Sequence, residues 1–565
     1  MKATLKYLKP YSGTAAAALT LKVVGSAAEL FLPLILDYII DNVVPEKDVK
    51  LMIILGAAML GFSIVALLGN IFANRLAAKA AGGMTHDLRY DLFKKTTYLQ
   101  CSQVDAFTSP SLVSRLTSDT YYVNNTVAQS LRMGVRAPIL LVGGLVFTFI
   151  IDWRLALVLA ACVPFVAIAV ALIAGKSVKM YAVVQRGGDD VVRTMQENIS
   201  GVRVIKALSK TEYEVEKFRT VNANLTANEF ATNKITSLTN PIATLILNIG
   251  LVGVIAAGAA LSASTGTVLA FLTYFTLILN AMLGISKIFV NLSRGVASAA
   301  RIEKVMEVNE KMPVGVREES GNDYALEFSD VSFSYNGKRN NLEGISFGVK
   351  EGQTVGIIGG TGSGKSTLIN LLMRFYDVGG GAVYVDGKDV RTYEESELHA
   401  KFGAVFQSDF LISSSIFDNV DFFRSLPEED IDKAVECSCA KEFIDGLEGG
   451  MDYVLAQKAA NISGGQKQRL LIARALAGNP RILILDDSSS ALDYATDARL
   501  RKGLSEGYSH CTKFIVAQRV SAVRHADLII VLDDGRIVGK GTHDELYATC
   551  EDYRHICVAQ MGGDI

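Results

Sequence analysis

The chain has 565 residues, half of them hydrophobic, and its formal net charge is −2. This length is too great for a single compact core, so at least two domains are expected, and the near-zero charge gives no electrostatic support to nucleic-acid binding. The hydrophobic fraction is high for a water-soluble protein and low for a chain made only of membrane helices, which favours a membrane part joined to a soluble part.

The first segment, residues 1–11, has the pattern of a short amphipathic helix. Lys2, Lys6 and Lys9 fall on one helical face, and Leu5 and Leu8 fall on another. A helix of this kind lies in the plane of the bilayer interface, with its apolar face toward the acyl chains. We therefore expect residues 1–11 to lie on the cytosolic membrane surface as an elbow helix.

Residues 12–310 are predicted to form an α-helical membrane domain. A spanning helix needs about 20 predominantly apolar residues. Six stretches meet this requirement, at residues 13–40, 51–73, 135–151, 155–173, 238–261 and 268–290.

The connections between the spans indicate how the domain is oriented. Those after the second and fourth spans are long and basic, whereas those after the third and fifth are short. Basic connections remain in the cytosol, so the long connections and both termini are expected there, in a multi-pass protein of the cell membrane. Helical periodicity continues into the long connections, which predicts helices that extend into the cytosol. Val202, Val204, Ile205 and Leu208 of the second long connection need burial somewhere.

A few polar side chains fall inside the spans. Lys22 and Glu29 are seven residues apart and so share one face of the first helix. Charge inside a membrane is costly and usually faces a cavity or a partner. Lys22 can instead snorkel to the cytosolic interface, and Glu29 either pairs with another helix or contacts a substrate. Asn70, Asn248 and Asn280 either line a pathway or hydrogen-bond between helices.

An ordinary α/β pattern follows the last span, and its strongest signal is GGTGSGKS at residues 359–366. A β-rich run enters this glycine-rich turn and an apolar helix leaves it, which is the context of a phosphate-binding P-loop. Glycines let backbone N–H groups curl around phosphate oxygens, while Lys365 supplies charge to the β- and γ-phosphates and Ser366 a hydroxyl to Mg²⁺. The predicted phosphate contacts are Gly359, Gly360, Thr361, Gly362, Ser363, Gly364, Lys365, Ser366 and Thr367.

A second apolar strand, RILILD at residues 481–486, ends in an acid. This is the Walker B arrangement, in which Asp486 helps to hold Mg²⁺ beside the P-loop. The two motifs predict ATP and Mg²⁺ as ligands. Residues 326–565 are therefore expected to form an α/β P-loop nucleotide-binding domain, with residues 311–325 as a linker.

Between the two motifs lies NISGGQKQR, at residues 461–469. It closely resembles the signature sequence of ATP-binding cassette (ABC) transporters. The order of motifs over essentially the whole chain is similar to that of exporter-type (type IV) half-transporters, in which one membrane domain precedes one nucleotide-binding domain. Segments 107–119 and 197–207 resemble the family's two cytosolic coupling regions, and residues 32–45 resemble the end of its first membrane helix.

The resemblance implies roles for further residues. Tyr335 matches the aromatic that stacks on adenine, and Gln407 matches the Q-loop residue that reaches Mg²⁺ and senses the membrane domain. Residues from Ser490 to Asp493 match the D-loop. Two nucleotide domains are expected to meet head to tail, so that each ATP is held by the P-loop of one and the signature of the other. The signature contacts implied for the partner's ATP are Ser463, Gly464, Gly465 and Gln466.

The sequence departs from the family pattern at the hydrolysis residues. The family's catalytic base is a Glu, but Asp487 stands there with a side chain one methylene shorter, and about 1 Å of misplacement costs on the order of a hundredfold in rate. Gln518 stands at the position of the switch histidine and cannot take a positive charge, and Gln457 stands where the family commonly has Glu. This pattern resembles the degenerate-site subunit of heterodimeric multidrug exporters. It predicts a P-loop that binds ATP but hydrolyses it very slowly, beside a second and different ABC half-transporter.

Three other functions remain open at this point: a homodimeric exporter, an importer built on the exporter fold, as some siderophore-uptake systems are, and a non-transporting regulatory subunit or gated channel. Fold alone does not fix the direction of transport. Aromatic residues in the spans suit a small amphipathic or hydrophobic substrate. The expected partners are therefore a second half-transporter, the lipid bilayer and such a substrate, and not a nucleic acid.

Overall fold

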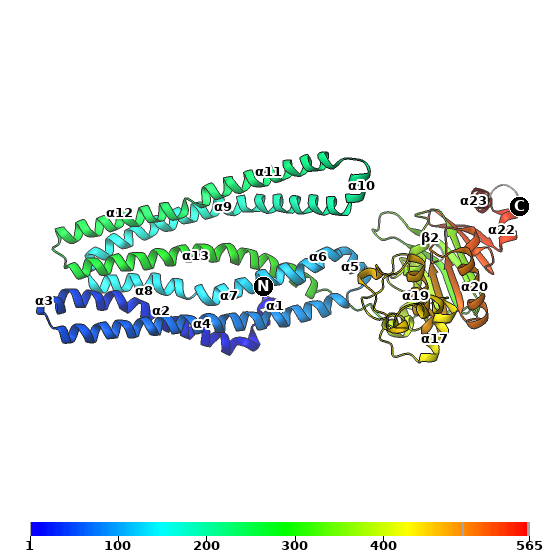
Figure 1. The fold of residues 1–565 in the computed structure, drawn as a ribbon, viewed down its shortest axis with the longest axis horizontal. Helices are drawn as coiled ribbons and strands as arrows, with labels where there is room; N and C mark the ends of the chain where they lie inside the picture. The colour runs from blue at the N-terminus through cyan, green and yellow to red at the C-terminus, as the bar shows by residue number, and fades with distance from the viewer. Residues whose placement is uncertain (1, 316, 318, 489–490, 562–565) are drawn as a thin grey trace. The chain divides into compact units, whose positions relative to one another are not determined.

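The computed structural model describes residues 2–315, 317, 319–488 and 491–561. Its contacts divide the chain into two compact units. The membrane unit comprises Met1–Leu99 and Phe107–Glu310, and the nucleotide-binding unit comprises Gln100–Ala106 and Lys311–Ile565. The first unit is helical and the second carries all the described strands (Figure 1). The predicted fold class, a helical membrane domain joined to an α/β domain, is confirmed.

Six helical segments in the described part of the chain are long and apolar enough to cross a membrane, which confirms the predicted number of spans. Several extend far beyond a bilayer thickness, and α9 and α11 run side by side to a turn formed by α10 (Figure 1). The helices up to Glu310 are α1 (Lys2–Lys6), α2 (Ser12–Tyr38), α3 (Val44–Glu46), α4 (Val49–Thr97), α5 (Cys101–Phe107), α6 (Ser109–Ser114), α7 (Thr120–Met133), α8 (Arg136–Ile151), α9 (Trp153–Ser200), α10 (Val202–Ala207), α11 (Thr211–Thr236), α12 (Thr239–Ala260) and α13 (Thr265–Met306).

The turns opposite the long extensions are tight because each one starts the next helix with a capping side chain. Asp48 accepts a hydrogen bond from the backbone N–H of Leu51 at 3.0 Å, and Asp152 accepts one from Arg154 at 2.8 Å. Ser264 accepts one from Thr267 at 3.3 Å. Each bond satisfies a backbone donor that has no partner within the first turn of a helix. Asp152 is thus the single residue between α8 and α9.

The N-terminal segment predicted as one short helix contains α1 and a separate 3-10 turn, Lys9–Tyr11. The hydroxyl of Tyr7 donates to Asp91 at 2.8 Å, and that of Tyr11 donates to Asp87 at 3.0 Å. Both carboxylates belong to α4. These two hydrogen bonds hold the elbow segment against α4.

Two observations qualify the predicted coupling regions. The segment that packs with the nucleotide-binding unit is Gln100–Ala106, immediately before residues 107–119, which the contacts assign to the membrane unit. In the turn at α10, Val202, Val204 and Leu208 are exposed to 43%, 61% and 65%, so this single chain does not supply the burial that their sequence leads one to expect.

The nucleotide-binding unit is built on a six-stranded sheet of order β10-β9-β3-β8-β7-β6. The five strands from β9 to β6 run parallel, and β10 is antiparallel to β9. All five residues of β7 are buried, as is typical of a parallel strand covered on both faces. The strands are β3 (Thr354–Gly359), β6 (Phe402–Val405), β7 (Ile482–Asp486), β8 (Thr512–Val516), β9 (Leu528–Asp533) and β10 (Arg536–Gly541).

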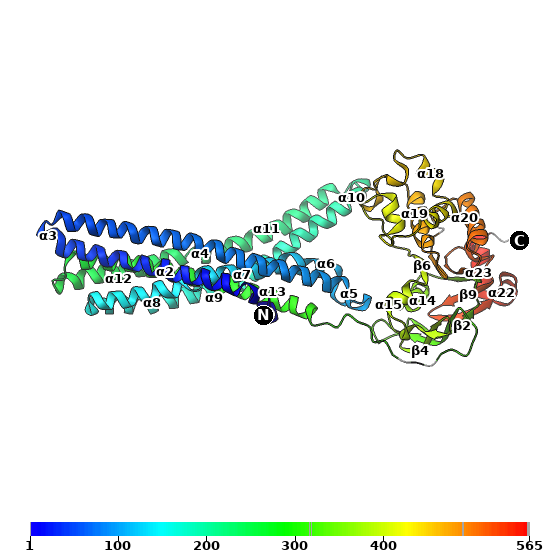
Figure 2. The same ribbon diagram turned by 90° about the horizontal axis from the view of Figure 1, so that it is seen from below.

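A second, four-stranded antiparallel sheet has the order β2-β1-β4-β5. Within this unit, Figure 2 shows α18, α19 and α20 at one end and β2 and β4 at the other. The remaining strands are β1 (Leu326–Phe333), β2 (Leu342–Val349), β4 (Gly380–Val385) and β5 (Lys388–Asp389). The helices are α14 (Lys365–Leu372), α15 (Glu395–His399), α16 (Ile416–Asp421), α17 (Glu428–Cys437), α18 (Lys441–Asp445), α19 (Gly464–Ala477), α20 (Tyr494–Gly507), α21 (Val520–Val523), α22 (His543–Thr549) and α23 (Glu551–Met561).

The parallel sheet explains where the functional side chains gather. Strands β3, β7 and β8 end at Gly359, Asp486 and Val516. Because the carboxyl ends of parallel strands meet at one edge of a sheet, the P-loop, the Walker B acid and the segment before Gln518 all begin at that edge.

Candidate nucleotide-binding site

The P-loop joins the end of β3 to the start of α14. Gly362 and Gly364 have φ angles of +85° and +104°, a backbone conformation that glycine adopts without strain. A Cβ atom on Gly359 would lie 2.1 Å from the carbonyl oxygen of Leu532, so only glycine fits there. A Cβ atom on Gly360 would have nothing within 4 Å. The loop is therefore packed tightly against β9 at its base and open at its tip.

The ammonium group of Lys365 lies within the curve of this loop. Its Nζ donates to the carbonyl oxygens of Gly359 at 3.0 Å and Gly360 at 2.7 Å. Burial lowers the pKa of Lys365 below its ordinary value, while the nearby carboxylates of Asp486 and Asp487 oppose that shift. A cation held in this way is oriented before any phosphate arrives, so the loop and its lysine fit the triphosphate of ATP.

Oxygen donors suited to Mg²⁺ lie beside the lysine. The hydroxyl of Ser366 donates to Oδ2 of Asp486 at 3.3 Å, and the backbone N–H of Gln407 also donates to this carboxylate. Asp486 is only 7% exposed, and burial raises its pKa. Hydroxyl, carboxylate and amide oxygens are the ligands that Mg²⁺ prefers, so Ser366, Asp486 and Gln407 fit that ion. When bound, Mg²⁺ neutralises charge on the β- and γ-phosphates.

Asp487 directly follows the Walker B acid and has a φ angle of +50°. Its backbone N–H donates to the carbonyl oxygen of Val516 at 2.8 Å, which fixes the main chain on the neighbouring strand. Burial raises the pKa of Asp487, and the positive charges of Arg519 and Lys365 oppose that rise. The backbone of Asp487 is therefore fixed, and the reach of its carboxyl group is set by the length of the side chain.

Gln518 has an exposed side chain, and its main chain is held by the last helix. Nε2 of Gln560, in α23, donates to the carbonyl oxygen of Gln518 at 2.7 Å. Oε1 of the same side chain accepts from the N–H of Val520 at 2.8 Å. One amide thus fixes both sides of the switch segment, a contact that no local sequence pattern would reveal.

Most of the predicted site residues line a single cavity of about 260 Å³. Tyr335, Gly359, Gly360 and Ser363 are outside its lining, which also includes three residues that the sequence analysis missed: Asn341, Val516 and Ala517. Oδ1 of Asn341 accepts a hydrogen bond from the backbone N–H of Tyr335 at 3.1 Å. The predicted residues in the lining are Thr361, Gly362, Gly364, Lys365, Ser366, Thr367, Gln407, Asp486, Asp487 and Gln518.

The signature residues start α19. Oγ of Ser463 accepts from the backbone N–H of Gln466 at 3.3 Å, and Oε1 of Gln466 accepts from the N–H of Ser463 at 2.8 Å. This reciprocal capping box defines the first turn of the helix. A Cβ atom on Gly464 would meet nothing within 4 Å. None of Ser463, Gly464, Gly465 and Gln466, all of them described, lines the cavity at the chain's own P-loop.

Comparison with known proteins decides the family. Residues 16–282 match the ABC transporter transmembrane region, and residues 342–490 match the ABC transporter family. The chain is 34% identical over 573 residues to the uncharacterized ABC transporter ATP-binding protein YfiB of Bacillus subtilis, a match that covers 100% of this chain and 99% of that protein. The chain belongs to the ABC transporter family.

Two further matches describe which kind of ABC transporter this is. The chain is 31% identical over 579 residues to the ATP-dependent lipid A-core flippase of Aromatoleum aromaticum, over 99% of this chain and 95% of that protein. The structure of a bacterial Atm1-family ABC exporter with ATP bound matches with a TM-score of 0.83 at 21% identity, over 98% of this chain and 99% of that chain. The fold is that of an exporter-type half-transporter, and its nucleotide-binding domain is an ABC ATPase.

Tyr335 of the transporter belongs to an aromatic cluster beside α14. Its ring is 46% exposed and makes edge-on contacts with Phe333 at 4.8 Å and Tyr376 at 5.0 Å between ring centroids. Nδ2 of Asn370 donates to its hydroxyl at 2.9 Å. The hydroxyl of Tyr376 donates to Asp105, in the α5 segment that packs with this unit. The aromatic that the family resemblance assigns to adenine is therefore two contacts from α5.

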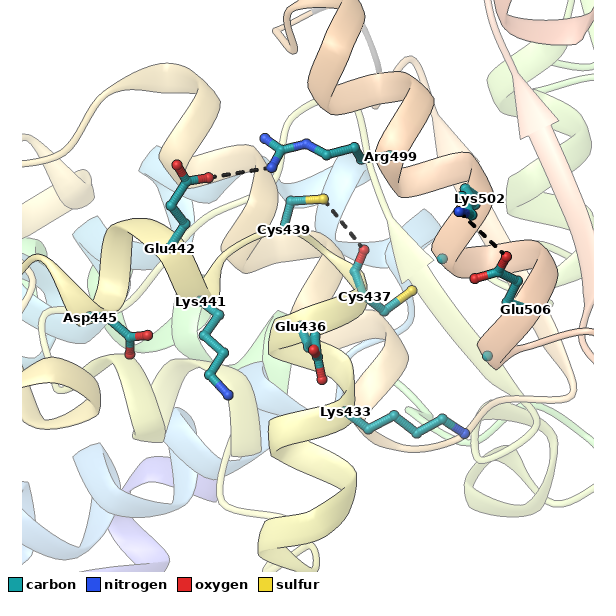
Figure 3. Close-up of a pocket in the computed structure, with 12 residues that line it drawn as sticks. Lys433, Glu436, Cys437, Cys439, Lys441, Glu442, Asp445, Arg499, Lys502 and Glu506 are labelled. Atoms are coloured by element: carbon teal, nitrogen blue, oxygen red, sulfur yellow. Dashed lines mark hydrogen bonds and ion pairs between the residues drawn. The ribbon is translucent and has the colours of Figure 1, made fainter.

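A larger hollow of about 800 Å³ lies elsewhere in this unit, between α17, α18 and α20 (Figure 3). The thiol of Cys439 donates to the carbonyl oxygen of Cys437, and burial raises the pKa of Cys437 to about 11, so that thiol stays protonated. No group of three or more His, Cys, Asp or Glu side chains suited to a metal ion occurs among the described residues. The hollow is lined by equal numbers of cationic and acidic side chains, so it has no excess charge to attract phosphate. The cations are Lys433, Lys441, Arg499 and Lys502, and the acids are Glu436, Glu442, Asp445 and Glu506.

The transporter also holds a polar cluster inside its membrane unit. Nη2 of Arg136 donates to both carboxylate oxygens of Glu29, at 3.1 and 2.9 Å, and Nδ2 of Asn70 donates to Oε1 of Glu29 at 2.9 Å. The interhelical role considered for Glu29 and Asn70 is thus present. Snorkelling of Lys22 is wrong, because this side chain is 3% exposed and its Nζ donates to Oδ1 of Asn74 at 3.2 Å.

Arg136 was missed by the sequence analysis although it lies within the third predicted span. The signal available was one basic residue in an apolar stretch, but the partner is 107 positions away. Of the other amides considered, Asn248 is exposed, and Asn280 lines a cavity in the membrane unit. Ser490 of the predicted D-loop lies outside the described residues.

Proposed function

We propose that this chain is the degenerate-site subunit of a heterodimeric exporter, whose own P-loop binds ATP and hydrolyses it very slowly. The observation that carries the proposal is the lining of the nucleotide cavity. Asp487 and Gln518 share this cavity with Lys365, Ser366 and Asp486. The groups needed to hold a triphosphate and Mg²⁺ are thus present, while the two positions used for hydrolysis carry a shortened acid and an uncharged amide.

The signature of this chain serves a second nucleotide-binding domain. Ser463, Gly464 and Gly465 stand at the open start of α19, away from the chain's own cavity. A helix start of this kind offers backbone donors and a favourable dipole to phosphate oxygens. In the proposed pair, they complete the site whose P-loop, catalytic Glu and switch His are on the partner subunit.

The proposal places the transporter in the cell membrane, with both termini in the cytosol and an amphipathic or hydrophobic compound as its cargo. The basic long connections support this orientation. The similarity to a protein named ATP-dependent lipid A-core flippase supports an amphipathic cargo. The exposed apolar side chains at α10, Val202, Val204 and Leu208, suit a contact with the second half-transporter.

ATP hydrolysis by the purified full-length chain, alone and co-expressed with a half-transporter that carries the catalytic Glu and switch His, tests the proposal. Ser463→Arg in this chain should lower hydrolysis by the pair about a hundredfold, the scale for losing a transition-state donor. Asp487→Asn should change it by less than about twofold, because little chemistry occurs at that site. Homodimers of the chain alone with vigorous, substrate-stimulated ATPase activity would contradict the proposal and favour the homodimeric exporter.

Transport direction needs a separate measurement. Uptake of cargo into inverted vesicles that contain the pair supports export, because the nucleotide-binding domains then face outward and ATP can be added from outside. Cargo movement out of such vesicles points to an importer with the exporter fold. ATP binding without uphill movement of any cargo points to a regulatory subunit or channel.

A further inference from the structure

The polar cluster inside the membrane unit contains more positive charges than its one acid can neutralise; we call Lys22, Arg132, Arg136 and Glu29 the cationic cluster. Glu29 forms an ion pair with Arg136 at 2.9 Å. Among the described residues, neither Lys22, on the same helix as Glu29, nor Arg132, four residues before Arg136, forms an ion pair with a carboxylate. The described side chains Lys22, Arg132, Arg136 and Glu29 thus include three cations and one acid, a formal excess of two positive charges. Lys22 bonds to the amide of Asn74, and Nε of Arg132 and of Arg136 is buried without a hydrogen-bond partner among the described atoms.

Four packed helices of the membrane unit hold this cluster, and a fifth helix, α13, packs against two of them. Lys22 and Glu29 are on α2, Asn70 and Asn74 on α4, and the arginines at the end of α7 and the start of α8. Contacts join α2 to α4, α7 and α8, and α13 packs against α7 and α8. The regular helix is interrupted between the two arginines, since α7 ends at Met133 and α8 begins at Arg136. Excess charge buried among membrane helices usually faces a cavity and marks a ligand pathway.

A cavity of about 230 Å³ opens at this position. Arg136 and Asn280 supply its polar lining, and the other wall residues are apolar or small: Met133, Ala137, Leu140, Leu277, Ala281 and Gly284. Small-molecule sites commonly combine apolar walls with a few polar groups that fix the orientation of a ligand. An arginine binds phosphate or carboxylate through several N–H groups at once.

The position of the cavity along the bilayer normal can be estimated from α8, which begins at Arg136. Arg136 precedes the turn at Asp152 by 16 residues of α8, about 24 Å at 1.5 Å per residue. The hydrocarbon core of a bilayer is about 30 Å thick. In the orientation proposed above, the guanidinium therefore lies near the cytosolic side of the core, with apolar helix surface between it and the opposite interface.

We propose that this cationic cavity binds the anionic headgroup of an amphipathic cargo, whose hydrocarbon chain lies along the apolar walls. The inference rests on the proposed export function and adds the charge class of the cargo. Arg136 and Asn280, which line the cavity, bind the anion, and Glu29 holds Arg136 in place and opposes the anion. Arg132 lies outside the lining, next to the lining residue Met133, and adds positive charge.

Binding to the full-length transporter in phosphatidylcholine nanodiscs tests the proposal. The probes are a 16-carbon lysophosphatidate, a lysophosphatidylcholine with the same chain, and inorganic phosphate. Lysophosphatidate should bind about tenfold more tightly than lysophosphatidylcholine, a difference of about 1.4 kcal/mol. Inorganic phosphate, which has no chain to bury, should bind far more weakly. Equal affinity for the two lysolipids, or tight binding of inorganic phosphate alone, overturns the proposal.

Two variants with opposite expected effects separate ligand attraction from a structural role. Arg132→Gln removes a cation that holds no described carboxylate and should weaken lysophosphatidate binding about tenfold. Glu29→Gln removes the opposing charge and should tighten that binding, while lysophosphatidylcholine binding stays unchanged in both variants. Lys176→Gln, at an exposed cation on α9, is the matched control and should change neither affinity. If both cluster variants weaken binding of both lipids alike, the cluster is structural and the proposal fails.

Nucleotide binding, measured on the same nanodiscs, separates this inference from the function on which it rests. Loss of the lysophosphatidate preference with normal ATP binding rejects only the anionic cargo. Failure of the wild-type transporter to bind Mg-ATP rejects the proposed function itself. A monodisperse elution profile and normal ATP affinity in each variant exclude misfolding as the cause of a lost lipid affinity.

Discussion

Lengthening the side chain at position 487 tests the degenerate site most directly. The backbone there cannot advance toward a bound nucleotide, because the N–H of Asp487 is bonded to Val516 at 2.8 Å and the adjacent Asp486 is tied to Ser366. Asp487→Glu therefore extends the carboxylate by one C–C bond, about 1.5 Å. Since about 1 Å of misplacement costs on the order of a hundredfold in rate, we expect a gain of about that size in hydrolysis at this P-loop.

The assay is phosphate release by the heterodimer, with the partner's own catalytic Glu replaced by Gln so that only this chain's P-loop contributes. Asp487→Glu is combined with Gln518→His, which restores a group able to carry positive charge toward the γ-phosphate. Adding Lys365→Ala to the restored chain should abolish the gain, because it removes the cation held in the loop. An unchanged rate in the restored pair would refute the reasoning that these two positions limit hydrolysis.

The remaining predictions concern the same unit. Gly359→Ala should destabilise it by about 1–3 kcal/mol through overpacking against Leu532, whereas Gly360→Ala, with open space around it, should leave the melting temperature unchanged; calorimetry that shows equal effects would contradict this. Gln560→Ala should reduce the hydrolysis gained by the restored chain several-fold while ATP affinity is retained, because the switch backbone loses both of its bonds to α23. In a pair whose partner carries Gln in place of its catalytic Glu, the residual hydrolysis at this chain's P-loop should fall as the pH drops through the raised pKa of Asp487, since a base must be deprotonated. A pH profile of that silenced pair that Asp487→Asn leaves unaltered would exclude this carboxyl as the base.

Short-range patterns in the sequence were sufficient to predict the membrane spans and the nucleotide-binding motifs. Hydropathy counted over single helices gave the six spans, since a bilayer sets the length of each span independently of its neighbours. The spacing of glycines, Lys365 and Ser366 identified the phosphate loop, because all of its groups come from one turn of chain. The acid at the end of β7 was equally readable, since parallel strands deliver their ends to a common edge.

The tertiary structure decided which distant side chains meet. Lys22 looked able to snorkel, but packing of α2 on α4 gives it Asn74 as a partner inside the unit. Glu29 pairs with Arg136 across 107 positions, and Gln560 reaches back across 42 positions to hold Gln518. Spans and loops follow from local composition, whereas these pairs depend on how whole helices pack. The sequence around one partner therefore does not identify the other. For that reason the nucleotide loop was legible in the sequence, and the excess positive charge beside the membrane cavity appeared only in the fold.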